Sequence, residues 1–88
     1  MKVTTAKIIV IQEDGMRPAR YTDPSKAAEH WAQVKSEEWI EKVKDDPKYK
    51  NNRGRVTNEV FGDGKVRYRK LKRRALRVFR KVMNINKE

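Results

Sequence analysis

The stretch from Lys65 to Lys81 constrains the fold most strongly, because ten of its seventeen residues are Lys or Arg and none is acidic. Unpaired cations are costly to bury, so these side chains must reach solvent in any stable fold. Apolar residues are interleaved with them, which predicts that each element of the stretch sets a basic face against an apolar one. The ten are Lys65, Arg67, Arg69, Lys70, Lys72, Arg73, Arg74, Arg77, Arg80 and Lys81.

The positive charge is unevenly distributed along the chain. Residues 1–49 contain nine basic and nine acidic residues, whereas residues 50–88 contain fourteen basic and three acidic residues. The entire net charge of +11 therefore belongs to the second half. A concentrated excess creates a local field, so it indicates a polyanionic partner better than a high overall pI does.

Length and composition exclude several classes of protein. Eighty-eight residues are expected to form one domain, residues 1–88, with a small core. The chain has no cysteine and a single histidine, His30, so disulfide frameworks and thiolate or multi-histidine zinc sites are excluded. The longest apolar run, Ile8 to Ile11, is too short to cross a bilayer. We expect a soluble cytoplasmic protein with no metal, no cofactor and no membrane partner.

The N-terminal residues have the pattern of a β-hairpin. The β-branched stretch Lys2 to Gln12 predicts a strand, and four consecutive apolar residues within it predict burial on both faces in a central position. Asp14-Gly15 predicts the turn, because Gly adopts positive φ freely. Arg17 to Thr22 is the predicted returning strand, and Pro18 places it at an edge because proline cannot donate a ladder hydrogen bond.

A helical region follows the hairpin. Asp23 is a predicted N-cap, and Pro24 suits the first helical position. The apolar face shifts around the helical wheel midway, which predicts a helix over about 24–35, a break near Ser36 and a second helix over about 37–46. Trp31 and Trp39 are predicted to pack in the core.

The residues from Arg55 to Leu71 have features of a second hairpin. Gly62-Asp63-Gly64 is the predicted turn. A three-residue loop there pairs Val60 with Val66 and sorts apolar from charged residues. In such a strand the alternating cations Lys65, Arg67 and Arg69 would share one face.

The last predicted element is an amphipathic helix from Leu71 to about Asn84. Its apolar side is expected to close the core with Leu71, Ala75, Val78, Phe79 and Val82. Its basic side spans a separate arc of roughly 120° that no acidic residue interrupts. The residues of that arc are Arg73, Arg74, Arg77, Arg80 and Lys81.

Together these elements predict a small single-domain α+β fold. The predicted order is β-β-α-(α)-β-β-α, with an antiparallel sheet of three or four strands packed on helices. The basic strand and the basic C-terminal helix would form one continuous positive surface.

The favoured function is non-enzymatic binding of RNA or DNA, mainly through phosphates. Solvated protein surfaces usually mix charges of both signs, whereas this surface carries one sign only. The polar loop between the helices and the second hairpin adds cations and an aromatic residue that can stack on bases. The predicted binding residues are Lys65, Arg67, Arg69, Arg73, Arg74, Arg77, Arg80, Lys81, Lys50, Arg53, Arg55 and Tyr49.

Two alternatives use the same cations. The protein could be an inhibitor or adaptor that docks on an acidic protein surface. It could also be a small metal-independent ribonuclease that stabilises phosphorane charge, for which the candidates are Arg67, Tyr68, Arg69, Arg73 and Arg77. Glu29-His30 lacks a nucleophile or metal partner, and His30 is interpreted as a surface histidine on a helix, so no catalytic residue is assigned.

Overall fold

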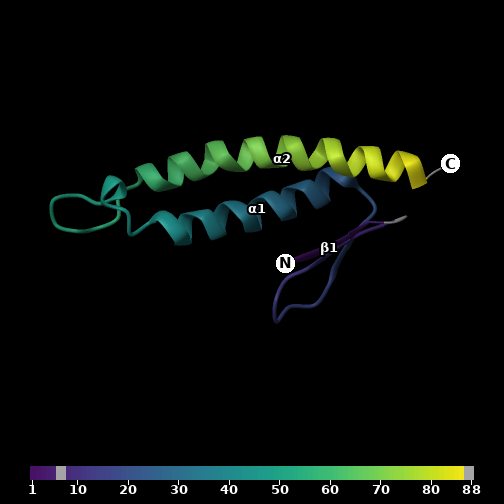
Figure 1. Ribbon diagram of the computed structural model, residues 1–88, viewed down its shortest axis with the longest axis horizontal. Coiled ribbons are helices and arrows are strands. Elements are labelled where there is room, and N and C mark those ends of the chain that lie inside the picture. Colours follow the sequence, from purple (N-terminus) through teal and green to yellow (C-terminus); the bar gives the residue numbers. More distant parts are fainter. Residues whose placement is uncertain (6–7, 87–88) are drawn as a thin grey trace.

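A three-stranded sheet lies at one end of a long antiparallel pair of helices (Figure 1). The computed structural model describes residues 1–5 and 8–86, with side chains described as far as Met83. The predicted α+β class is confirmed, although the elements differ from the predicted order. They are β1 (Lys2–Thr5), β2 (Ile9–Gln12), β3 (Ala19–Tyr21), α1 (Pro24–Val43), the 3-10 helix η1 (Pro47–Tyr49) and α2 (Glu59–Asn86).

The sheet has the order β1-β2-β3 and both strand pairs are antiparallel. The prediction of one strand from Lys2 to Gln12 is wrong because β1 pairs with β2, and the part of that prediction on residues 6 and 7 lies outside the described residues. β2 is central, as predicted. Ile9 and Ile11 are fully buried whereas Val10 between them is half-buried, so the apolar run fills one face and not both.

The predicted turn and returning strand are present. The backbone N–H of Met16 donates to the carbonyl of Glu13 at 3.1 Å, and Gly15 has a φ of 75°. Glycine suits this position because it has no Cβ to clash at positive φ. β3 follows Pro18 and forms the edge of the sheet, in agreement with the inability of proline to join a ladder.

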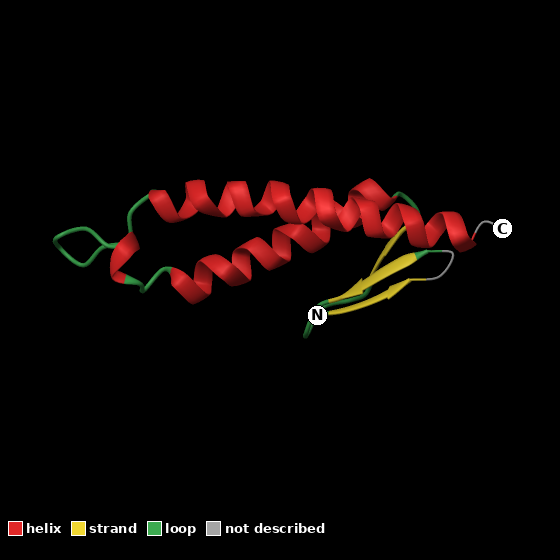
Figure 2. Cartoon of the chain, turned by 45° about the horizontal axis from the view of Figure 1, so that its top comes forward, coloured by secondary structure: helices red, strands yellow, loops and turns green. Residues whose placement is uncertain are grey.

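Helix α1 begins as predicted but is not interrupted. The Asp23 carboxylate accepts a hydrogen bond from the backbone N–H of Ser25 at 2.9 Å, and Pro24 is the first helical residue. The predicted break at Ser36 is wrong: Ser36 is buried inside α1, and its hydroxyl donates to the carbonyl of Gln33 at 3.0 Å. The apolar face shifts because the sheet lies beside the first part of α1 only, while α2 runs along both parts (Figure 2).

The predicted second hairpin is wrong, because residues 59–86 form one continuous helix. Gly62-Asp63-Gly64 is helical. A Cβ atom on Gly64 would lie 2.7 Å from Cδ1 of Ile40, so this glycine permits close approach of α2 to α1. The buried residues Val60, Gly64, Ala75 and Phe79 show that one apolar face extends from the first turn of α2 to Phe79.

The core is built largely from small side chains. Its main cluster joins the inner face of β2 to both helices and contains Ile9, Ile11, Ala27, Ala28, Ala75 and Phe79. Ala28, Ala32 and Ser36 form a buried stripe along α1 at spacings of four residues. Trp31 and Trp39 are half-buried, and Val78 is 51% exposed, which contradicts its predicted place in the core.

Candidate nucleic-acid interface

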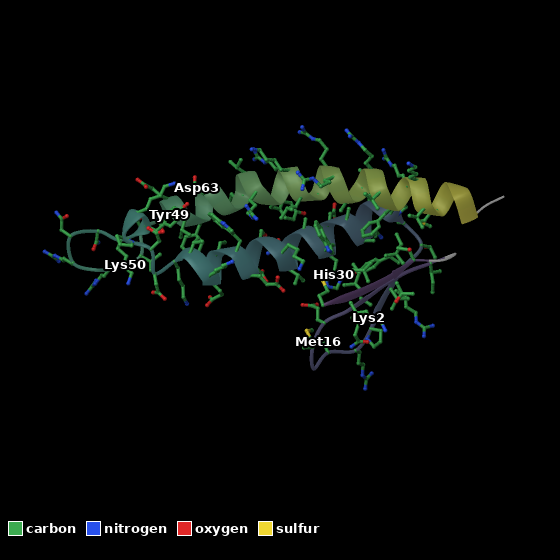
Figure 3. The ribbon with its side chains drawn as sticks, viewed as in Figure 1. Lys2, Met16, His30, Tyr49, Lys50 and Asp63 are labelled. Carbon is green, nitrogen blue, oxygen red and sulfur yellow. The ribbon has the colours of Figure 1, made fainter. Side chains whose placement is uncertain are left out.

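The side of α2 that faces away from α1 carries the basic residues (Figure 3). We call this side the outer face of α2 and define it by the nine exposed cations between residues 65 and 81. They are Lys65, Arg67, Arg69, Lys70, Arg73, Arg74, Arg77, Arg80 and Lys81. The eight cations that the sequence predicted in this stretch thus lie on one helix, and not on a strand followed by a helix.

Helical geometry determines which cations lie together. At roughly 100° per residue, Lys65 and Arg69 are neighbours on the outer face. The prediction that Arg67 shares their side is wrong, because it assumed a strand, and on the helix Arg67 lies roughly 160° around from Lys65. Arg67 is at the edge of the outer face, where its guanidinium lies 5.4 Å from the centre of the Trp39 ring of α1, in a cation–π contact.

The outer face has few acidic neighbours to neutralise it. Among the described residues, only Lys72 of the ten cations in this stretch forms an ion pair, with its Nζ 3.0 Å from Oε1 of Glu29. That hydrogen bond raises the pKa of Lys72. Lys72 is half-buried between the helices and does not belong to the outer face. The nine exposed cations repel one another, so an anionic partner would stabilise this surface.

The polar loop beyond η1 is a hydrogen-bonded tip at the end of the molecule remote from the sheet (Figure 1). The Asn51 side-chain oxygen accepts hydrogen bonds from the backbone N–H groups of Arg53 at 2.9 Å and Arg55 at 3.0 Å. Both arginine residues are exposed, whereas Lys50 lies 3.5 Å from the carboxylate of Asp45. The tip therefore presents two exposed arginine residues, Arg53 and Arg55. They precede α2 in the chain, whereas the outer face begins at Lys65 within α2.

Tyr49 does not have the exposure that base stacking requires. It is 5% exposed, and its hydroxyl donates to Oδ2 of Asp63 at 2.8 Å. Its ring lies edge-on to Trp39 with centroids 6.0 Å apart. The hydrogen bond to Asp63 is the main cause that raises the Tyr49 pKa above its usual value. Tyr49 anchors the tip to α2, and we leave it out of the proposed interface.

A polar cluster links the β2–β3 turn to α1, and the sequence did not reveal it. Nε2 of His30 lies 2.8 Å from Oε2 of Glu13, and Nδ1 lies 2.7 Å from the Tyr21 hydroxyl. His30 is half-buried, so its interpretation as a surface histidine on a helix is wrong. The three partners are separated by up to seventeen residues, and only the packed hairpin brings them together. Their contacts fix the hairpin on α1.

The residues of the ribonuclease alternative do not converge. Tyr68 is half-buried and lines a groove with Ile40 and Phe61 between the helices. It lies roughly 140–180° around the helix from Arg73 and Arg77.

In the described part of the chain, no three His, Cys, Asp or Glu side chains gather in a way that could hold a metal ion.

Comparison of the chain with protein-family models, with curated proteins and with solved structures finds no match. Within residues 1–5 and 8–86, no helix combines the length and the hydropathy needed to cross a membrane. A functional assignment must therefore be argued from the surface chemistry of this chain, of which the outer face of α2 is the most distinctive part.

Proposed function

We propose that this protein binds nucleic acid without enzymatic activity and that the outer face of α2 contacts the phosphates. One observation supports the proposal above all: nine exposed cations lie along one helix with no ion-pair partner among the described residues. From Lys65 to Lys81 the helix is about 24 Å long at 1.5 Å per residue. A nucleic-acid backbone offers regularly spaced negative charges over such a length.

The rigidity of the helix strengthens this argument. In a flexible tail, like charges separate and lower their repulsion, whereas the backbone hydrogen bonds of α2 hold the cations one turn apart. Six of the nine are arginine residues, whose planar guanidinium groups bind phosphate oxygens through two parallel hydrogen bonds. Binding phosphates relieves the repulsion and adds charge-assisted hydrogen bonds.

An acidic protein partner fits the outer face less well. Protein–protein interfaces usually have an apolar or aromatic centre surrounded by a polar rim. Val66 is an exposed apolar side chain of the outer face, but along the helix it lies near one end of that face, between Lys65 and Arg67, and not at its centre. This composition is typical of nucleic-acid interfaces, which are more polar and more positive than those between proteins.

The proposal is tested with two variants of equal net charge. One variant replaces Arg73, Arg77 and Arg80 by Glu. The control variant replaces Lys2, Arg17 and Arg20 by Glu, and these three residues are exposed at the sheet end of the molecule. Each variant lowers the net charge by six units, since every reversal changes it by two. Binding to labelled DNA and RNA is measured by fluorescence anisotropy, and folding by circular dichroism.

We expect the α2 variant to stay helical and to bind at least about tenfold more weakly than the control variant, because three positive charges of the outer face become negative and repel the phosphates. Equal binding by the two folded variants would show that only overall charge matters and would contradict the proposed interface. Failure of the wild-type protein to bind any nucleic acid at low salt would contradict the function itself.

A further inference from the structure

The shape of the molecule narrows the kind of nucleic acid that the outer face can bind. The described chain is thin, with extents of 57 × 26 × 14 Å, and α2 forms one long edge of it (Figure 1). Helix α1 and the sheet both lie below α2 in the view of Figure 3, on the side away from its outer face. The molecule therefore presents a single helix along an open edge, and neither the sheet nor α1 obstructs the approach of a partner to that edge.

The nine cations cover a continuous arc of roughly 200° around α2, at roughly 100° per residue. We call the cations nearer the middle of this arc the central row and those toward its two ends the flanks. The central row is Lys70, Arg73 and Arg77; one flank is Lys65, Arg69 and Arg80; the other flank is Arg67, Arg74 and Lys81. Val66, which is 50% exposed, lies among the central residues.

A groove between two phosphate backbones matches a basic arc of this width. The major groove of B-form DNA is about 12 Å wide and admits a helix whose diameter with side chains is about 10–12 Å. The two flanks would then face the two phosphate walls while the central row faces the base edges. A single strand offers one line of phosphates, and the major groove of A-form RNA is too deep and narrow for side chains to read.

We propose that the outer face of α2 enters the major groove of B-form duplex DNA, an inference that rests on the proposed nucleic-acid function. Flanking cations contact phosphates on both walls, and Arg73 and Arg77 reach the groove floor, where guanine O6 and N7 accept two hydrogen bonds from arginine. The exposed side chain of Val66 would also have a role, because an apolar side chain at the floor of the major groove can contact the thymine methyl group.

The test compares four ligands of one sequence and length at the same salt concentration. They are duplex DNA, duplex RNA, single-stranded DNA, and duplex DNA whose cytosines carry bulky glucosyl groups that fill the major groove. Netropsin, which occupies the minor groove, serves as a competitor on the unmodified duplex. We expect unmodified duplex DNA to bind at least about tenfold more tightly than the other three ligands, and netropsin to have little effect.

A second pair of variants separates the floor of the groove from its walls. Arg73→Gln with Arg77→Gln should lower the preference for guanine over 7-deazaguanine, which lacks the N7 acceptor. Lys65→Gln with Arg80→Gln should keep that preference and reduce the salt dependence of binding.

Binding that requires the outer face but is equal for duplex RNA or for glucosylated DNA would overturn the groove proposal and leave the proposed function standing. Loss of binding with netropsin alone would also overturn it, since the protein would then occupy the minor groove. No binding to any of the four ligands would contradict both proposals.

Discussion

The hydrogen bond from the Tyr49 hydroxyl to the Asp63 carboxylate ties η1 to the first turns of α2. Both residues belong to segments that the sequence assigned to a polar loop and a hairpin turn. The contact explains why a tyrosine in such a polar region is buried. It also gives the tip of the molecule a fixed position relative to α2, because η1 cannot turn without breaking it.

This contact predicts a particular dependence of stability on pH. The folded state raises the Tyr49 pKa above its ordinary value near 10, so it holds the phenol proton more tightly than the unfolded chain does. The stabilisation is complete below pH 10 and is lost as the pH rises through the higher pKa of the folded state. Tyr49→Phe should therefore lower the thermal midpoint at neutral pH, and its deficit relative to wild type should shrink above pH 10.

Thermal unfolding followed by circular dichroism between pH 7 and pH 11.5 checks this expectation. Asp63→Asn is the matched variant, because it removes the acceptor charge that raises the Tyr49 pKa and keeps a similar side-chain shape. A deficit of Tyr49→Phe that stays constant across the whole pH range would contradict the role of the hydrogen bond.

At the scale of elements, the packing of α1 against α2 holds the outer face in place. Gly64 faces Ile40 at a distance that leaves no room for a Cβ atom, whereas a Cβ on Gly62 would meet no atom within 4 Å. The two glycines are two residues apart in one helix and differ mainly in what they face. They therefore separate the effect of helix propensity from that of close packing.

Alanine should change the stability of the protein differently at these two positions. Gly62→Ala should stabilise the protein by about 0.5–1 kcal/mol, because alanine favours the helix. Gly64→Ala should be at least about 1 kcal/mol less stable than Gly62→Ala, because its Cβ collides with Cδ1 of Ile40. Urea unfolding gives both values.

Ile40→Val supplies the control for Gly64→Ala, since valine lacks the Cδ1 atom that would collide. The double variant should be more stable than the sum of the two single effects predicts. Equal stability of Gly62→Ala and Gly64→Ala would show that α2 does not depend on close approach at Gly64.

Local chemistry explains which elements the sequence could predict. The Asp14-Gly15 turn and the Asp23 cap depend on residues next to one another, so both predictions are confirmed. The prediction of a second hairpin failed because it relied on the low intrinsic helix propensity of glycine. In the folded protein, contact of Gly64 with Ile40, twenty-four residues away, outweighs this low propensity. The prediction of a break at Ser36 also failed because of tertiary packing. The apolar face shifts midway along α1 because the sheet packs on only part of this helix.

The candidate site was predicted more completely in its residues than in its geometry. The sequence identified the cations between Lys65 and Lys81 because an uninterrupted basic run is visible without a fold. Their arrangement in one continuous arc required the helix, as did the contacts of Arg67 with Trp39 and of Lys72 with Glu29. The cluster of Glu13, His30 and Tyr21 had no sequence signal, because only tertiary packing unites it.

For the whole molecule, the uneven charge of the sequence becomes a spatial separation. Residues 1–49, which form the sheet, α1 and η1, carry no net charge, and the excess lies in the tip and α2. A thin molecule with one charged edge can place that edge against a polyanion while its neutral parts remain away from it. The field of such an edge also steers a polyanion toward the correct orientation before contact.

The dependence of binding on salt tests the central claim most directly. The equilibrium binding constant for duplex DNA is measured over a series of salt concentrations, for the wild type and for the Arg73, Arg77 and Arg80 charge-reversal variant. If the outer face of α2 neutralises about five phosphates, the plot of log K against log salt should have a slope near −4.5 for the wild type and a much smaller slope for the variant. Binding that is independent of salt, or an unchanged slope in the folded variant, would contradict the claim that this face contacts the phosphates.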